Sequence, residues 1–148
     1  MARKTQFSVD MSKAIKNAED DIETIVKLSS LGLFRAIVLK TPVDTGHLAY
    51  NWQASINNPE NSVRQGVDPD KQTTISDGEG NINKWITKDK IIWITNNVHY
   101  AEDIEYGKSK VKAPQGMVRV SLREFDSIFR GAALTANRGS GNKGNRYL

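Results

Sequence analysis

The stretch that decides the fold is TPVDTGHL, which runs from Thr41 to Leu48. Proline disfavours helical geometry in the residue before it, so a helix that leads into this stretch ends by Thr41. The Asp44 and Thr45 side chains can bond local backbone N–H groups, and Gly46 permits an unusual dihedral angle. We therefore predict a structural corner here, between a helix and a strand.

An amphipathic helix is predicted before the corner, over residues 10–40 and about 45 Å long. Its start can be capped by Ser8 or Asp10, and Gly32 leaves open a division into two shorter helices. Its apolar residues recur mostly at steps of three and four: Met11, Ile15, Ala18, Ile22, Ile25, Leu33 and Ile37.

After the corner the apolar period changes to two, which predicts a strand over residues 47–56 that includes Trp52. Residues 57–89 are polar and predict a long loop. The turn signal at residues 77–81 suggests that this loop carries a short hairpin, with residues 73–76 and 82–86 as its arms.

A second strand is predicted at residues 90–95, where the apolar run suits burial on both faces. Residues 100–106 form a short helix or a strand edge, and the helical period returns over residues 116–134. We expect the apolar face of this last helix to consist of Met117, Ser121, Leu122, Phe125, Ile128, Phe129 and Ala132. Residues 135–148, rich in Gly and Asn, should form a flexible tail. The chain is thus predicted to be one α+β domain over residues 1–134, with an inserted loop and a tail.

The composition excludes several kinds of site. Cysteine is absent, so disulfides and thiolate chemistry are ruled out. With no signal-peptide pattern and no long apolar run, we expect a protein made in the cytoplasm and kept there unless a particle carries it out. The net charge is +4, and Arg138, Lys143 and Arg146 of the tail supply three of these charges. The body is therefore almost neutral.

Candidate chemistry is sparse. Asp44 and His47 form a conceivable catalytic pair without a serine nucleophile beside them, and we interpret them as structural. His99 stands among three carboxylates, but His99 and Glu102 alone do not complete a metal site. We expect no catalytic residue, no metal and no cofactor. Trp52 and Trp93 are expected in the core, whereas Trp85, between lysines, is kept as a possible partner contact together with the three basic tail residues.

The order of motifs resembles the neck or tail-completion family of tailed bacteriophages, also called head–tail joining or minor tail proteins. The resemblance rests on TPVDTGHL after a long helix, an aromatic strand, HYAEDIEYG, and APQGMVR before a last helix. The residues that match are Thr41, Pro42, Val43, Asp44, Thr45, Gly46, Leu48, Trp52, Tyr100, Ala101, Glu105, Gly107, Ala113, Pro114, Gly116 and Met117. The long loop and the C-terminal end depart from the family pattern.

The resemblance implies a non-enzymatic structural protein of the virion. Such a subunit forms a ring, commonly a hexamer, at the head-proximal end of the tail. The ring completes the tail and joins it to the head connector, and its partners are further copies of itself and the adjoining head-connector, tail-terminator or tail-tube proteins. Genome DNA passes through its lumen, and no membrane is involved. The alternatives are another connector or tail-tube component, a small nucleic-acid-binding protein that uses the basic tail, and, last, a hydrolase.

Overall fold

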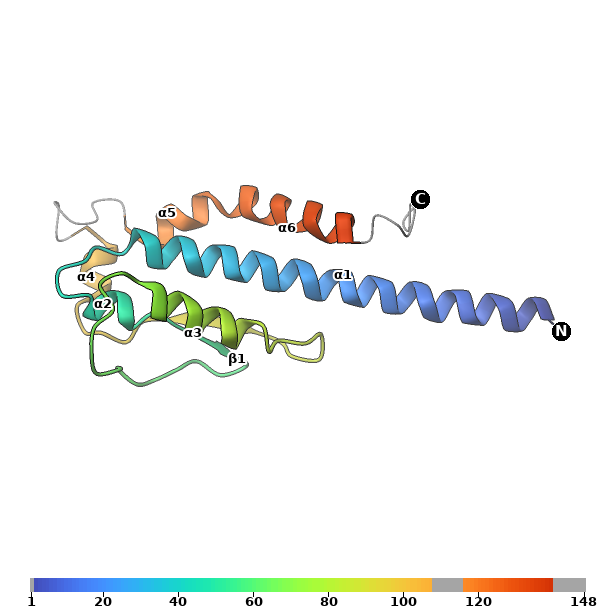
Figure 1. The fold of residues 1–148 in the computed structure, drawn as a ribbon, viewed down its shortest axis with the longest axis horizontal. Helices are drawn as coiled ribbons and strands as arrows, with labels where there is room; N and C mark the ends of the chain where they lie inside the picture. Colours follow the sequence, from blue (N-terminus) through green and yellow to red (C-terminus); the bar gives the residue numbers. More distant parts are fainter. Residues whose placement is uncertain (1, 108–115, 140–148) are drawn as a thin grey trace.

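One long helix organises the molecule (Figure 1), a computed structural model that describes residues 2–107 and 116–139. Helix α1 spans Ala2–Lys40 without a break. It starts eight residues before the predicted start, and the division into two helices at Gly32 is wrong. Gly32 lies directly under Ile128 of the last helix, and a Cβ there would be 2.6 Å from Ile128 Cγ2. Tertiary packing therefore accounts for this glycine.

The other elements lie on two sides of α1 (Figure 1). Along one side run α5 (Val118–Arg123) and α6 (Phe125–Gly139), with α6 antiparallel to α1. On the other side lie α2 (His47–Tyr50), α3 (Gln72–Ile82) and a sheet of two strands. The N-terminal part of α1 extends beyond both groups. The predicted α+β class is confirmed.

The sheet consists of β1 (Gln53–Ile56) and β2 (Ile92–Thr95), which pair antiparallel with Ala54 opposite Ile94. The predicted first strand is wrong for residues 47–52, since residues 47–50 form α2 and residues 51 and 52 precede β1. Leu48 and Ala49 are both buried although they are neighbours in sequence, and successive residues of a strand face opposite ways. Of the alternating residues, 48 and 50 therefore belong to a helical turn, and Trp52 belongs to the link between this turn and β1.

The predicted hairpin within residues 57–89 is also wrong, because residues 72–82 form helix α3. Two tertiary contacts explain a helix where DGEG indicated a turn. The buried Asp68 carboxylate accepts hydrogen bonds from the backbone N–H and the hydroxyl of Thr74, each at 2.7 Å. Gly78 lies against the ring of Phe34, where a Cβ would be 2.1 Å from ring carbon Cε1. The remainder of 57–89 lacks helix or strand.

The core lies between the C-terminal third of α1, α3 and the sheet. Two linked hydrogen bonds lie beside this core at the C-terminal end of α1. Trp52 Nε1 donates to Thr41 Oγ1 (2.7 Å), and this hydroxyl donates to the Ile37 carbonyl (2.8 Å). The predicted core position of Trp52 is confirmed. The core residues are Phe34, Ile37, Val38, Leu48, Trp52, Ala54, Ile75, Ile82, Val98, Ala101 and Met117.

The last helical region begins near the predicted residue, but it is interrupted at Glu124 and continues to Gly139. Residues 135–139, assigned to a flexible tail, are therefore helical, and residues 140–148 lie outside the described residues. The predicted apolar face is only partly buried. Met117, Ser121 and Ala132 are buried, whereas Leu122, Phe125 and Phe129 are 52%, 37% and 44% exposed. No helix in the described ranges is both long enough and apolar enough to cross a membrane.

The contact between Gly78 and Phe34 predicts opposite effects at two glycines of α3. Gly78→Ala should lower the free energy of unfolding by about 1–3 kcal/mol, because the added methyl group collides with the ring. Gly80→Ala should raise it by up to about 1 kcal/mol, since a Cβ there meets nothing within 4 Å and alanine favours a helix. Urea denaturation measures both, and equal effects would contradict the packing.

Candidate functional site

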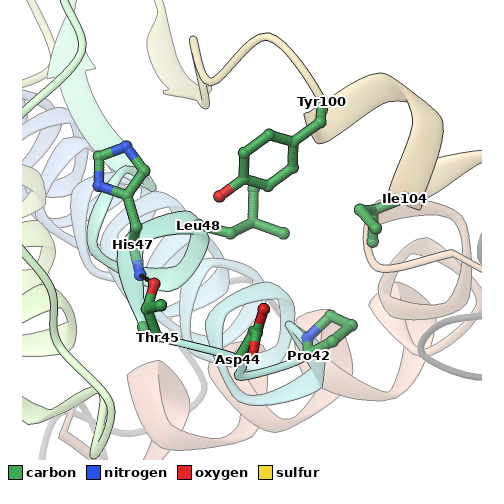
Figure 2. Close-up of a pocket in the computed structure, with 8 residues that line it drawn as sticks. Pro42, Asp44, Thr45, His47, Leu48, Tyr100 and Ile104 are labelled. Carbon is green, nitrogen blue, oxygen red and sulfur yellow. Dashed lines mark hydrogen bonds between the residues drawn. The ribbon is translucent and has the colours of Figure 1, made fainter.

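The candidate site is a pocket of about 340 Å³ at the end of the molecule where α1 ends. One wall is the corner, residues 42 and 44–48, and the other consists of Tyr100 and Ile104. In Figure 2, Tyr100 reaches over Leu48, while Pro42 and Asp44 lie on the other side of the opening. The pocket thus joins two motifs that lie more than fifty residues apart in sequence.

The corner is held in place by backbone contacts with residues 66–69. The Gly46 carbonyl accepts the N–H groups of Tyr50 and Asp68, each at 3.0 Å. Gly46 has a φ of 93°, and a Cβ there would be 2.6 Å from Pro69 N. Only glycine satisfies both constraints, so the predicted role of this residue as a structural turn agrees with the geometry.

His47 has a structural partner. Its Nδ1 lies 2.7 Å from the Gly66 carbonyl oxygen. A carbonyl can only accept, so Nδ1 carries the proton and donates it. The backbone N–H of His47 donates to Thr45 Oγ1 at 3.2 Å, the dashed line of Figure 2. The imidazole therefore fastens the corner to the following loop, as the structural interpretation of this residue requires.

The HYAEDIEYG segment contacts the start of the last helical region through Glu105, which is the last residue of α4 (Ala101–Glu105). Its Oε1 accepts the backbone N–H groups of Met117 (2.8 Å) and Val118 (2.7 Å), and its Oε2 accepts Arg119 Nε (3.0 Å). The carboxylate thereby binds the first N–H groups of α5, which have no partners within the helix. Its side chain is only 13% exposed.

The environment of Glu105 favours its charged form. Burial by itself raises the pKa of this carboxyl, but the hydrogen bonds from Val118, Met117 and Arg119 outweigh it and hold the pKa below its ordinary value. Gly116 permits this approach, since it has a φ of 89° and a Cβ there would be 2.2 Å from Glu105 Oε2. Glu105, Gly116 and Met117 therefore form one structural unit.

The remaining predicted site residues divide into three groups. Thr41, Trp52 and Ala101 are buried in the core, and Gly107 has a φ of 74° at the end of α4. Val43 is exposed at the corner. Ala113, Pro114, Lys143 and Arg146 lie outside the described residues, as does the side chain of Arg138, whose backbone belongs to α6.

Trp85 does not offer an exposed ring to a partner. Its side chain is only 6% exposed, and its Nε1 has no hydrogen-bond partner in the described part of the chain. The ring is therefore not accessible to a partner in this conformation, and the contact by this residue stays a prediction. Trp93, expected in the core, is half-buried, and its Nε1 donates to the Asn57 carbonyl at 3.0 Å.

His99 is exposed, and its ring packs edge-on against Tyr100 with 5.0 Å between the ring centroids. Within residues 2–107 and 116–139, no group of three His, Cys, Asp or Glu side chains could hold a metal ion. In the segment that follows His99, Tyr100 and Ile104 line the pocket, and Glu105 caps α5.

Sequence reasoning missed three polar residues that hold the irregular segment before α3. Asp68 caps α3, and its pKa lies below the ordinary value: burial raises it, but the hydrogen bonds from Thr74 prevail. The fully buried Asn51 exchanges side-chain hydrogen bonds with the backbone of Arg64. Arg64 covers the Tyr50 ring at 4.0 Å and pairs with Asp77 at 3.0 Å. These partners are distant in sequence, so no local pattern indicated them.

No protein-family model matches this chain. No similar curated protein and no similar solved structure was found either.

The Glu105 cap predicts an acid-sensitive contribution to stability. The folded-state pKa of the carboxyl is lowered, so its stabilisation is present above the ordinary value of 4.5 and is lost as the pH falls through the folded value. Glu105→Gln should lower the free energy of unfolding at pH 7 by about 1–3 kcal/mol and weaken its dependence on pH below about 4.5. The exposed neighbour Glu102, as Glu102→Gln, should change neither by more than about 0.5 kcal/mol. Denaturation at a series of pH values measures both.

The hydrogen bond at the end of α1 predicts a second stability effect. Thr41→Val removes the acceptor of the buried Trp52 N–H and should cost about 1–3 kcal/mol, whereas Thr87→Val, at an exposed position, should cost about 0.5 kcal/mol or less. Adding Trp52→Phe to Thr41→Val should cost less than the sum of the single changes. Strict additivity, measured by denaturation, would contradict the coupling.

Proposed function

We propose that this chain is a structural subunit of the neck of a tailed phage. Copies would form a ring at the head-proximal end of the tail, complete the tail and join it to the head connector. The observation that carries the proposal is the convergence of the three family-like motifs at one end of the molecule. The corner and Tyr100 share one pocket, and Glu105 binds the start of α5 next to Met117.

The geometry at this end suits a docking surface on a rigid frame. The pocket opens between Pro42, Leu48 and Ile104, whose apolar side chains can receive a side chain from an adjoining protein. Positive-φ glycines at 46 and 116 and the Glu105 cap fix the backbone around it. A surface fixed in this way loses little conformational freedom on binding.

Two further features agree with a ring subunit. In the two-stranded sheet, each strand has an edge that pairs with no other strand in the described ranges, and a neighbouring copy can extend such an edge. The body of the chain is almost neutral, since three of the four net positive charges belong to Arg138, Lys143 and Arg146. A nearly neutral lumen would let DNA pass without retaining it.

The alternative of a nucleic-acid-binding protein is less well supported. Stacking on bases needs an exposed aromatic ring beside basic residues, and Trp85 is buried. Another connector or tail-tube component remains the second proposal, because the same pocket could receive a different neighbour.

The proposal is tested by deleting the coding sequence from the phage that carries it. We expect lysates with filled heads and separate tails, and a loss of infectious particles of at least a hundredfold. A plasmid copy of the protein should restore joined particles, and so should Gly80→Ala as a folded control. Electron microscopy of the lysate reads the result. Joined, infectious particles without the protein would contradict a neck role, and tails of abnormal length would favour a tail-tube component.

A further inference from the structure

The apolar stripe of α1 that faces α6 continues beyond the end of α6. Ser29 is buried, and Gly32 lies against Ile128. Ile15, Ala18 and Ile22 precede them on the same helical face, at steps of three, four and seven residues. Ile15 and Ile22 are 56% and 52% exposed. Since Ile128 lies on Gly32 and the two helices are antiparallel, Ile22 lies opposite the last turn of α6, and the part of α1 that precedes it extends past α6 (Figure 1). The packing between α1 and α6 thus ends while the stripe that mediates it continues.

A second apolar surface lies on α5 and α6. It consists of Leu122, Phe125 and Phe129, which are 52%, 37% and 44% exposed. The centroids of the two phenylalanine rings lie 6.2 Å apart. These residues border the packed side of α6, where Ala132 and Ala136 are buried. This surface therefore continues an interface that is already apolar.

The two surfaces match in spacing and in shape. Ile15, Ala18 and Ile22 lie at steps of three and then four, which places them on one face of α1. Phe125 and Phe129 lie four residues apart on one face of α6, and Leu122 precedes them in α5, across the interruption at Glu124. Ala18 is a small residue between two isoleucines, which makes a hole. Phe125 is a large residue between Leu122 and Phe129, which makes a knob. Helices pack by inserting such knobs into such holes.

One copy cannot make this contact by itself. Since α6 runs antiparallel to α1 and Ile128 lies on Gly32, Phe125 lies beside α1 close to residue 35. Ala18 is seventeen residues farther along α1, or roughly 25 Å at 1.5 Å per residue. The Phe125 ring can reach an Ala18 only in another copy.

We propose that the surface of Ile15, Ala18 and Ile22 on one copy packs against Leu122, Phe125 and Phe129 of the next copy. The proposal rests on the proposed ring and names the contact that builds it. Two different surfaces meet, so the contact is head-to-tail, and repeated head-to-tail contacts close into a ring when the rotation allows. The matched area is on the order of a few hundred Å², below that of a stable pairwise interface. Subunits should therefore stay separate in dilute solution and assemble at high concentration or on a tail.

Photo-crosslinking tests the contact. Phe125 is replaced by p-benzoylphenylalanine, which retains an aromatic ring, and light and ¹⁵N-labelled copies are mixed at a concentration where light scattering shows assembly, or on purified tail tubes. After irradiation and trypsin digestion, we expect adducts between copies at peptide 17–27, which contains Ala18 and Ile22. The same photo-residue at Ser127, exposed on the opposite side of α6, is the control and should give at least tenfold less of this adduct.

Two substitutions with equal charge change provide an independent readout. Ala18→Arg fills the hole and should weaken assembly at least tenfold by light scattering. Asn17→Arg, which points to another side of α1, should leave assembly unchanged. Both variants should unfold at the same denaturant concentration as the parent, because residues 17 and 18 lie near or beyond the end of α6.

The outcomes separate this contact from the neck role. Rings in electron micrographs without the adduct at 17–27, or equal adducts from positions 125 and 127, would overturn the contact and leave the neck role intact. Adducts only within one copy, or none with or without tail tubes, would overturn it as well. The adduct together with joined particles in the deletion phage would support the contact and reject the neck role.

Discussion

The fold depends on the burial of the C-terminal third of α1 on two sides. A single helix of this length gains most of its stability from tertiary packing, and only residues from about Ser29 onward have partners on both faces. Phe34 meets Gly78 of α3 on one side, while Gly32 meets Ile128 of α6 on the other. At the end of the helix, Thr41 bonds both Ile37 and Trp52. The position of every other element follows from these contacts.

The same dependence on α1 explains what the sequence could and could not predict. Three features were predicted because their causes are local. The helix ends at Thr41 because Pro42 follows, the second strand follows from its apolar run, and the turn follows from the backbone freedom of Gly46. Helix α3 was not predicted, because Gly78 is required by a ring forty-four residues away and the cap from Asp68 lies outside the helix. The buried face of the last helix was only partly predicted, since periodicity does not distinguish burial by this chain from burial by another.

For the candidate site, the motifs were predictable as separate patterns but their convergence was not. Glu105 stands in a segment with three carboxylates, and nothing in that segment distinguishes it from Glu102 or Asp103. Its role becomes visible only when the N–H groups of Met117 and Val118 are placed against it. Asn51 and Arg64 carry no local signal at all. In this protein, many polar side chains hold backbone groups in position, across gaps that run from six residues between Asp68 and Thr74 to forty-eight between Asn96 and Leu48.

The unbroken α1 also fixes both the distance and the relative rotation between the surfaces at its two ends. Its 39 residues correspond to about 58 Å, so the pocket at one end and the free apolar stripe near the other are held at a fixed separation without a hinge. Each residue turns the helix by about 100°. Removing seven residues between them would bring the two ends closer and turn the stripe by only about 20°, whereas removing five would turn it by about 140°. The length of this helix can therefore change with little rotation of the stripe only by steps close to a whole number of turns, such as seven or eleven residues.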